Sequence, residues 1–145
     1  MKAVVQRVRE AKVFVEGRMI STIGKGVVVL LGVGVSDSKK EATYLAQKIA
    51  NLRIFEDENN KMNLSLLDVQ GEVLIVSQFT LYGDCRKGRR PDFTRAAKHD
   101  KAQDLYTCFV GAMKDIGVSV KTGQFQARML VTIHNDGPVT LILET

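Results

Sequence analysis

The chain of 145 residues is 45% hydrophobic and 26% charged, and its net charge is +5. This length and composition suit one globular domain with a real core and exclude a largely disordered chain. The mild positive charge is compatible with a polyanionic partner such as nucleic acid, and about equally with solubility alone. The two cysteines form no disulfide framework, and the longest apolar run, residues 27–35, falls short of the ~18 residues of a membrane span. Because no signal-peptide pattern opens the sequence, we expect a cytoplasmic protein without membrane association.

Strand and helix signals follow one another in the first part of the chain. The Val-rich segment at residues 3–15 predicts a strand, and the apolar segment at residues 26–33 predicts a buried central strand. Ser38 and Glu41 fit a capping box, and the apolar stripe behind them predicts a helix that ends near Asn51.

The rest of the chain carries one more helix signal among several strand signals. Residues 52–55 predict a short strand and residues 72–79 a second buried strand. A possible second capping box at residues 100–103 accompanies a helical apolar stripe that Gly117 ends. Further strand signals lie at residues 118–122, 129–134 and 139–144. Because strands come in pairs and triplets around two helices, we expect a single α/β domain over residues 1–145, with largely antiparallel mixed sheets and the helices packed outside.

Ordinary catalytic signatures are sparse in this sequence. The two histidines and two cysteines lack the close spacing of zinc ligands, so we expect no metal and no cofactor. Cys85, which precedes two cations, is a weak candidate nucleophile, and neither a Gly-rich phosphate loop nor paired carboxylates stand out. An enzyme built on this sequence would rely on backbone donors, hydroxyl groups or chemistry supplied by its substrate.

The second buried strand ends in three polar side chains with an aromatic one between them: Ser77, Gln78, Phe79 and Thr80. Strand ends on a rigid scaffold carry binding and catalytic groups, and backbone N–H groups freed there can stabilise an oxyanion. The alternative is an ordinary strand end whose side chains satisfy local backbone groups, and the residues alone favour it.

Two other segments stand out. Asn135, Gly137 and Pro138 mark a turn between two predicted strands, for which a plain hairpin is favoured over a cis Gly-Pro bond with two carbonyl groups directed to one side. A basic run lies shortly after the polar strand end and contains Arg86, Lys87, Arg89 and Arg90. These cations either hold nucleic-acid phosphates or form a solvated loop, with about equal weight.

Taken together, these segments resemble the D-aminoacyl-tRNA deacylase family. Residues 77–81, Ser-Gln-Phe-Thr-Leu, match one family motif in full, and residues 135–140, Asn-Asp-Gly-Pro-Val-Thr, match the other, which is Asn-x-Gly-Pro-Val-Thr. The likeness covers the chain end to end, including its opening Met-Lys-Ala-Val-Val-Gln-Arg-Val, and neither motif shows a departure.

The resemblance implies a cytoplasmic homodimer that hydrolyses the ester joining a D-amino acid, or misattached glycine, to the terminal adenosine of tRNA. By the same resemblance, residues 77–80 line the pocket, and a cis Gly137-Pro138 enters the pocket of the other subunit and excludes L-amino acids. Arg7 would brace the Gly-Pro turn, Met129 would touch the adenine, and Asn135 would be a further supporting residue. The terminal 2′-hydroxyl of the tRNA would assist the reaction. The competing class is a non-enzymatic RNA-binding module that uses the basic loop alone.

Overall fold

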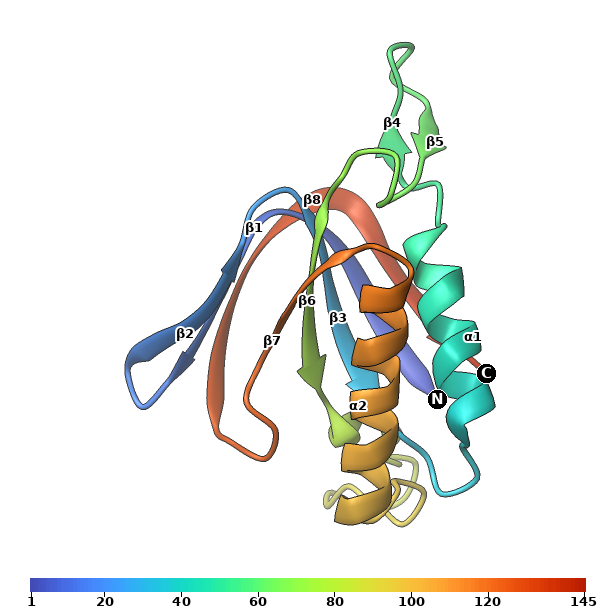
Figure 1. Ribbon diagram of the computed structural model, residues 1–145. Helices are drawn as coiled ribbons and strands as arrows, with labels where there is room; N and C mark the ends of the chain where they lie inside the picture. The colour runs from blue at the N-terminus through green and yellow to red at the C-terminus, as the bar shows by residue number, and fades with distance from the viewer.

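The computed structural model covers residues 1–145 and consists of a curved sheet with two helices on one of its faces (Figure 1). The strands of this sheet are β1 (Lys2–Val15), β2 (Arg18–Ile23), β3 (Gly26–Gly32), β6 (Glu72–Ser77), β7 (Ser119–Thr122) and β8 (Met129–Glu144). The helices are α1 (Lys39–Ala50) and α2 (His99–Asp115), with a 3-10 turn, η1 (Phe79–Tyr82). A two-stranded arm of β4 (Phe55–Glu56) and β5 (Met62–Leu64) projects from one end of the molecule (Figure 1).

The sheet mixes antiparallel and parallel pairs, as the sequence predicted. Its order is β2-β1-β3-β6-β7, with β8 paired to β1. β1 is antiparallel to β2, β3 and β8, whereas β3–β6 and β6–β7 are parallel. β1 changes partners at its middle, because residues 2–8 pair with β3 and residues 11–15 pair with β2. β8 accompanies both halves of β1, so the sheet stays continuous where it curves.

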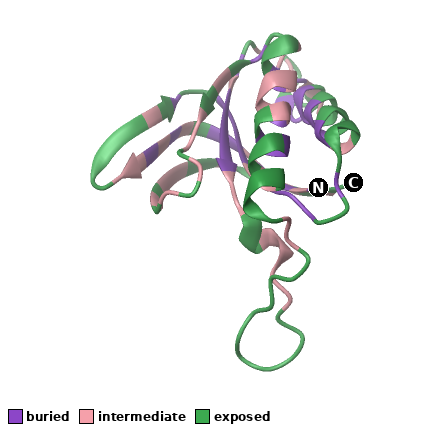
Figure 2. Ribbon diagram, turned by 60° about the horizontal axis from the view of Figure 1, so that its bottom comes forward, coloured by how far each residue is buried: buried purple, intermediate pink, exposed green.

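Both faces of the sheet bury apolar side chains, and the larger cluster lies under the helices (Figure 2). Leu45 and Ile49 of α1, and Phe109 and Met113 of α2, pack against strand residues that include Ile75. The smaller cluster fills the concave side of the curved sheet and contains Val8, Ala11, Val13, Ile23, Val28, Leu74 and Val76. β6 is therefore buried on both faces, which explains its uninterrupted apolar sequence.

The two predicted capping boxes have different outcomes. The first is confirmed: the N–H of Lys40 donates to Ser38 Oγ at 3.3 Å, and the N–H of Ser38 donates to Glu41 Oε2 at 2.8 Å. The second is wrong, because α2 begins two residues earlier, after Lys98, whose side chain makes no capping bond. The carboxylate of Asp100 pairs instead with the imidazole of its neighbour His99.

The hairpin favoured at Asn135–Thr140 is also wrong. The segments on either side of Gly137-Pro138 both run antiparallel to β1, so they run in the same direction as one strand, β8. Between the pairs Gln6–Thr140 and Val8–Asn135, five residue steps of β8 oppose two of β1. The extra residues leave the sheet as a wide bulge, which we call the Gly-Pro bulge and define as residues 135–139.

Two predicted strands are shorter than expected. The segment at residues 52–55 is strand only from Phe55, because the carbonyl of Ile54 accepts a hydrogen bond from the Arg7 side chain at 2.6 Å. β6 ends at Ser77, where the chain turns into η1. No helix combines the length and apolar character that crossing a lipid bilayer requires.

Candidate active site

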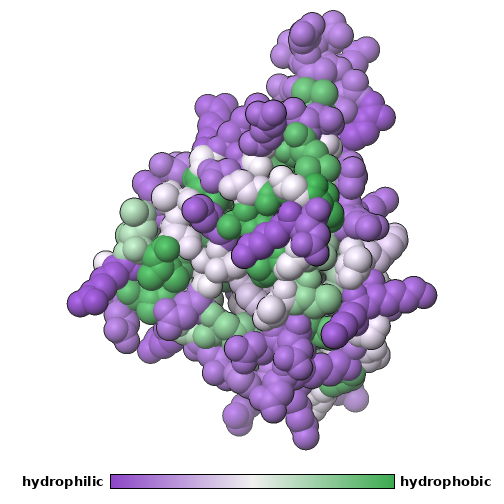
Figure 3. Space-filling view, in the orientation of Figure 1, coloured by the Kyte–Doolittle hydropathy of each residue, from purple (hydrophilic) through white to green (hydrophobic).

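A pocket of about 620 Å³ opens where β6 ends, and we call it the β6 pocket. Three parts of the chain form its wall: the end of β6 with η1, the start of α2, and the segment leading into β8. The wall residues are Val76, Ser77, Gln78, Phe79, Ala97, His99, Ala102, Phe125, Gln126, Ala127, Met129 and Val131. Four predicted site residues, Ser77, Gln78, Phe79 and Met129, are thereby brought together. Figure 3 shows that hydrophobic atoms gather in the middle of the molecule, between a mainly hydrophilic arm and a mainly hydrophilic opposite end.

The end of β6 supplies hydrogen-bond donors to this site. The N–H of Gln78 extends the parallel pairing by donating to the carbonyl of Leu31 at 2.8 Å. The N–H groups of Phe79 and Thr80 begin η1 and therefore have no partner within that turn, and no loop or turn hydrogen bond uses them. Thr80 is exposed and lies outside the pocket wall, with its hydroxyl accepting a hydrogen bond from the Gln78 amide.

Glycine at the end of β3 lets η1 lie close against the sheet. A Cβ atom at Gly32 would meet the carbonyl oxygen of Gln78 at 3.0 Å, and one at Gly34 would meet the hydroxyl of Tyr82 at 2.7 Å. That hydroxyl lies 3.3 Å from the buried carboxylate of Asp37. Burial, and then the charge of Asp37, raise the pKa of Tyr82, so the phenol stays protonated and donates to the carboxylate.

Aromatic and small residues without a recognisable motif complete the pocket. The ring of Phe125 contacts the ring of His99 at 5.5 Å and that of Tyr106 at 5.6 Å between centroids. His99 is the one ionisable side chain in the wall, and its Nδ1 lies 2.8 Å from the carboxylate of Asp100. The sequence did not identify His99 or Phe125 as site residues, because each lies outside any recognised motif and far along the chain from residues 77–80.

The Gly-Pro bulge is held by the side chains of Arg7 and Asn135, which the family resemblance named as supporting residues. The amide of Asn135 donates to the carbonyl groups of Arg7 and Val139, at 2.9 and 3.1 Å, and so closes the base of the bulge. The Gly137-Pro138 bond is cis, and both residues are exposed at the tip.

Arg7 is the anchor beneath the bulge and is only 5% exposed. Its guanidinium donates to the carbonyl groups of Ile54, Asp136 and Gly137, at 2.6, 3.2 and 3.4 Å. It also pairs with the Asp136 carboxylate at 3.1 Å. Arg7 therefore ties the arm, the bulge and β1 together through a planar group with fixed donor directions.

The β6 pocket and the Gly-Pro bulge lie at opposite ends of the sheet. The bulge begins opposite Val8 of β1. Val8 pairs with Gly26 of β3, and Gly26 pairs with Glu72, so the bulge is level with the start of β6. The pocket wall begins at Val76, and four residue steps along β6 correspond to about 13 Å. One copy of the chain therefore does not bring its own Gly137-Pro138 to its own pocket.

The basic run lies in the exposed loop between η1 and α2. Arg86 makes two close contacts with Asp84, at 2.9 and 3.0 Å from its Nε, and this pairing lowers the pKa of Asp84. Lys87, Arg89 and Arg90 make no ion pair and line none of the larger pockets. No group of three His, Cys, Asp or Glu side chains is arranged to hold a metal ion.

The fold and the pocket define an α/β protein with an open site at the end of a buried strand, walled by apolar and amide groups. A family model described as D-Tyr-tRNA(Tyr) deacylase matches residues 4–144. The chain belongs to this family of deacylases.

Individual relatives agree with the family match over the full length. The D-aminoacyl-tRNA deacylases of Thermosipho africanus and Thermus aquaticus are 60% and 59% identical to the chain; each alignment covers 100% of the chain, and 97% and 95% of the respective relative. A solved structure named "c-Myc DNA Unwinding Element Binding Protein" is 47% identical, with a TM-score of 0.95 over 100% of the chain and 99% of the other. A probable eukaryotic D-amino acid tRNA deacylase, 18% identical with a TM-score of 0.85 over 98% and 97% of the two chains, shares the fold.

Proposed function

We propose that the protein is an editing hydrolase that cleaves the ester of D-aminoacyl-tRNA, and of glycine mischarged on tRNA, while sparing L-aminoacyl-tRNA. The full-length match to deacylases of this name supports the substrate class. The cytoplasm, where aminoacyl-tRNA is used, is the expected setting. The observation that carries the mechanism is the composition of the β6 pocket, which is rich in apolar and amide groups and poor in ionisable ones.

The chemistry of the reaction is assigned to the substrate's own terminal 2′-hydroxyl. Its support is that the pocket wall contains no carboxylate and a single ionisable side chain, that of His99. The protein then contributes positioning, and the unpaired N–H groups of Phe79 and Thr80 are the donors for the developing oxyanion.

A nucleophilic Thr80 is the weaker alternative. A threonine nucleophile needs a neighbouring general base. The hydroxyl of Thr80 is bonded to the Gln78 amide, and no carboxylate or imidazole forms a hydrogen bond with it.

Chiral selection is assigned to Gly137-Pro138 of a second copy of the chain. The separation of the bulge from the pocket within one copy supports action between subunits, as does the exposure of both residues at the tip. Backbone carbonyl groups that exclude the L configuration at Cα do not need to recognise the identity of the side chain. Many D-amino acids and glycine are therefore accepted.

The deciding experiment is deacylation of D-tyrosyl-, L-tyrosyl- and glycyl-tRNA by the purified protein. We expect rapid release from the D-tyrosyl and glycyl substrates and little from the L-tyrosyl one. Replacing the terminal adenosine by its 2′-deoxy form should abolish release, whereas Thr80→Ala should retain substantial activity. Complete loss with a folded Thr80→Ala protein, together with a trapped acyl intermediate, would reverse the ranking of the two mechanisms.

Action between subunits has its own test in mixed dimers. Ala102→Trp fills the pocket from α2, and Pro138→Trp enlarges the exposed tip of the bulge. Each variant alone should be inactive. Exchange of subunits between the two should restore about one quarter of wild-type activity, because half of the dimers then hold one intact pocket facing one intact bulge. No restoration in verified mixed dimers would contradict the model.

A non-enzymatic nucleic-acid-binding protein is the second candidate function. The 47% identical structure carries the name of a DNA-element binding protein, and the exposed cations of the loop after η1 favour a polyanion. Binding of D-tyrosyl-tRNA without release of the amino acid would favour this candidate, and release of the amino acid would exclude it as the sole function.

A further inference from the structure

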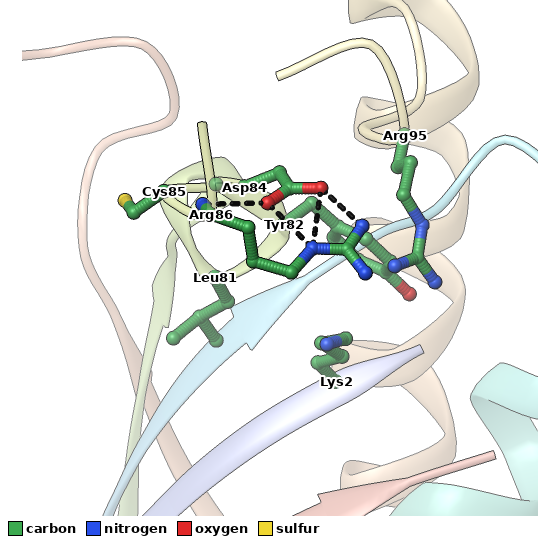
Figure 4. A pocket seen from close by; sticks show the side chains of 8 residues that line it. Lys2, Leu81, Tyr82, Asp84, Cys85, Arg86 and Arg95 are labelled. Carbon is green, nitrogen blue, oxygen red and sulfur yellow. Dashed lines mark hydrogen bonds and ion pairs between the residues drawn. The ribbon is translucent and has the colours of Figure 1, made fainter. Parts of the chain in front are cut away.

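A second pocket lies on the far side of η1 from the β6 pocket, and three cations are among its lining residues. It has a volume of about 410 Å³, and we call it the Lys2 pocket. Its positively charged side chains come from three separate segments: Lys2 at the start of β1, Arg86 in the basic loop, and Arg95 before α2 (Figure 4). Residues 81–83 of η1 and its end form the floor. The pocket thus shares a wall element with the β6 pocket.

The charges in the Lys2 pocket leave one cation free. Arg86 is paired with Asp84, and Lys2 lies 2.8 Å from Glu144 and 5.3 Å from the centroid of the Tyr82 ring. Arg95 makes no ion pair and no side-chain hydrogen bond, and its guanidinium lies over the pocket near Tyr82 (Figure 4). The net field of the pocket is therefore positive, and Arg95 has all of its donors available to an anion.

An exposed aromatic pair joins the two pockets. The rings of Phe79 and Phe93 meet edge to face, with centroids 5.2 Å apart and planes at 66°. Phe79 lines the β6 pocket and is 54% exposed, and Phe93 is 36% exposed. A Cβ atom at Gly83 would lie 3.0 Å from the Phe93 ring, so Phe93 packs against a residue that lines the Lys2 pocket. Along the surface, the β6 pocket is followed by Phe79, then by Phe93, and then by the cations of the Lys2 pocket.

We propose that this surface is a track for the single-stranded 3′ end of the RNA, in which Phe93 stacks on a base and Arg95 holds a phosphodiester. Aromatic faces beside cations are the usual means of holding unpaired nucleotides, because stacking tolerates any base and the cations follow the backbone. The inference rests on the proposed function, because an ester at the end of an RNA strand must enter the β6 pocket with the preceding nucleotides lying outside it.

Binding of uncharged RNA tests the track directly. The probes are a hairpin RNA with a short single-stranded 3′ end and the same hairpin with a blunt end. We expect Arg95→Gln to weaken binding of the first probe by about three- to tenfold and to reduce its salt slope by about 0.7, the value for one phosphate of a single strand. Phe93→Leu should weaken binding by about fivefold or more, as for loss of one stacked base.

A matched control is Lys114→Gln, which removes an exposed cation from the last turn of α2 and should change neither affinity nor salt slope. If Arg95→Gln weakened binding of the two probes equally, the proposal would be overturned. Such a result would reflect general charge attraction and no site specific for the single-stranded end. Unchanged affinity of both Arg95→Gln and Phe93→Leu for the probe with a single-stranded end would overturn it as well.

Hydrolysis separates failure of the track from failure of the proposed function. The minimal substrate 3′-O-D-tyrosyl-adenosine carries the ester but no phosphate. Wild type and Arg95→Gln should hydrolyse it equally, whereas Arg95→Gln should raise KM for D-tyrosyl-tRNA about three- to tenfold with kcat unchanged. If wild type hydrolyses both substrates and Arg95→Gln shows no change in KM, the track is wrong and the proposed function stands. If wild type hydrolyses neither, the proposed function is wrong.

Discussion

The β6 pocket and the Gly-Pro bulge both begin where a strand leaves its regular pairing, but they are held in different ways. The wall of the pocket comes from three distant segments that meet mainly through apolar contacts and ring edges. The bulge is fixed by directed bonds: the buried guanidinium of Arg7 and the amide of Asn135 together bond to the backbone carbonyl groups around it, and Arg7 also pairs with the carboxylate of Asp136.

This difference matches what the two regions are proposed to do. A pocket that positions an ester and binds an adenosine benefits from apolar walls that adjust to the ligand. A selectivity element that works by exclusion must keep its carbonyl groups in place, because a small displacement would admit the wrong enantiomer. Removing the polar side chains beneath the bulge should therefore lower the free energy of unfolding strongly. Substitutions beside the pocket should change activity with little loss of stability.

The largest effect is expected for Arg7→Ala. The substitution leaves three carbonyl groups and the Asp136 carboxylate without their buried donor, so the free energy of unfolding should fall by about 3 to 5 kcal/mol. Urea denaturation followed by circular dichroism measures this change. Arg9→Ala is the control, because Arg9 pairs with the same carboxylate at 3.2 Å but its side chain is 83% exposed. That substitution should cost about 0.5 kcal/mol or less. Equal losses for the two variants would show that Arg7 is no special anchor.

Asn135→Ala should have an intermediate effect. It removes two hydrogen bonds at the base of the bulge and should lower the free energy of unfolding by about 1 to 2 kcal/mol. Amide hydrogen exchange should locate the loss at the bulge and leave β3 and β6 protected. Uniform loss of protection across the sheet would argue against a local role for this side chain.

Gly123→Ala probes the pocket with little change in stability. The new methyl group would meet the sulfur of Met129 at 2.6 Å and displace that flexible side chain, which lines the pocket. The free energy of unfolding should stay within about 1 kcal/mol of wild type. Deacylation should fall by about tenfold, because the pocket wall is displaced. Gly111→Ala, a position in α2 with nothing within 4 Å of the added carbon, should leave activity unchanged. Normal activity of Gly123→Ala would remove Met129 from the substrate site.

The smallest effect is expected in the arm beside the bulge. The pKa of Asp57 is lowered, first by the backbone N–H of Lys61 and then by that of Asn59. A lowered pKa in the folded state stabilises the turn above the unfolded value of about 3.9, and this stabilisation is lost as the pH falls through the folded value. Amide chemical shifts of Asn59 and Lys61 should titrate below pH ~3.9 in wild type and not in Asp57→Asn. Titration at or above that pH would show that the turn does not favour the ionised carboxylate.

The sequence was sufficient where local chemistry decides the structure. The Val-rich start of the chain forms β1, the apolar run after it forms β3, and Ser38 caps α1 as predicted, because each signal lies within a few neighbouring residues. Residues 77–80 at the polar end of β6 were singled out as a possible site, although these residues alone favoured an ordinary strand end, and three of the four line the pocket.

The sequence was insufficient where distant partners decide the structure. Asn, Asp, Gly and Pro in succession indicate a turn, but pairing of both flanking segments with β1 converts that turn into a bulge within one strand. His99 and Phe125 could not be recognised as pocket residues, because they meet only after α2 packs across β6 and β7. The anchoring bonds of Arg7 to Ile54 and to the bulge likewise join residues that are far apart in the chain.

The length of β8 has a consequence for which changes this family can tolerate. One strand carries a pocket residue, Met129, at its start and Gly137-Pro138 near its middle, and pairing with β1 fixes its register on both sides of the bulge. β8 therefore fixes the distance between a residue of the pocket wall and the Gly-Pro bulge, which is the proposed selectivity element. Inserting or deleting a residue between positions 129 and 135 would change that spacing, so indels should be rare there and common in the exposed loop at residues 86–90.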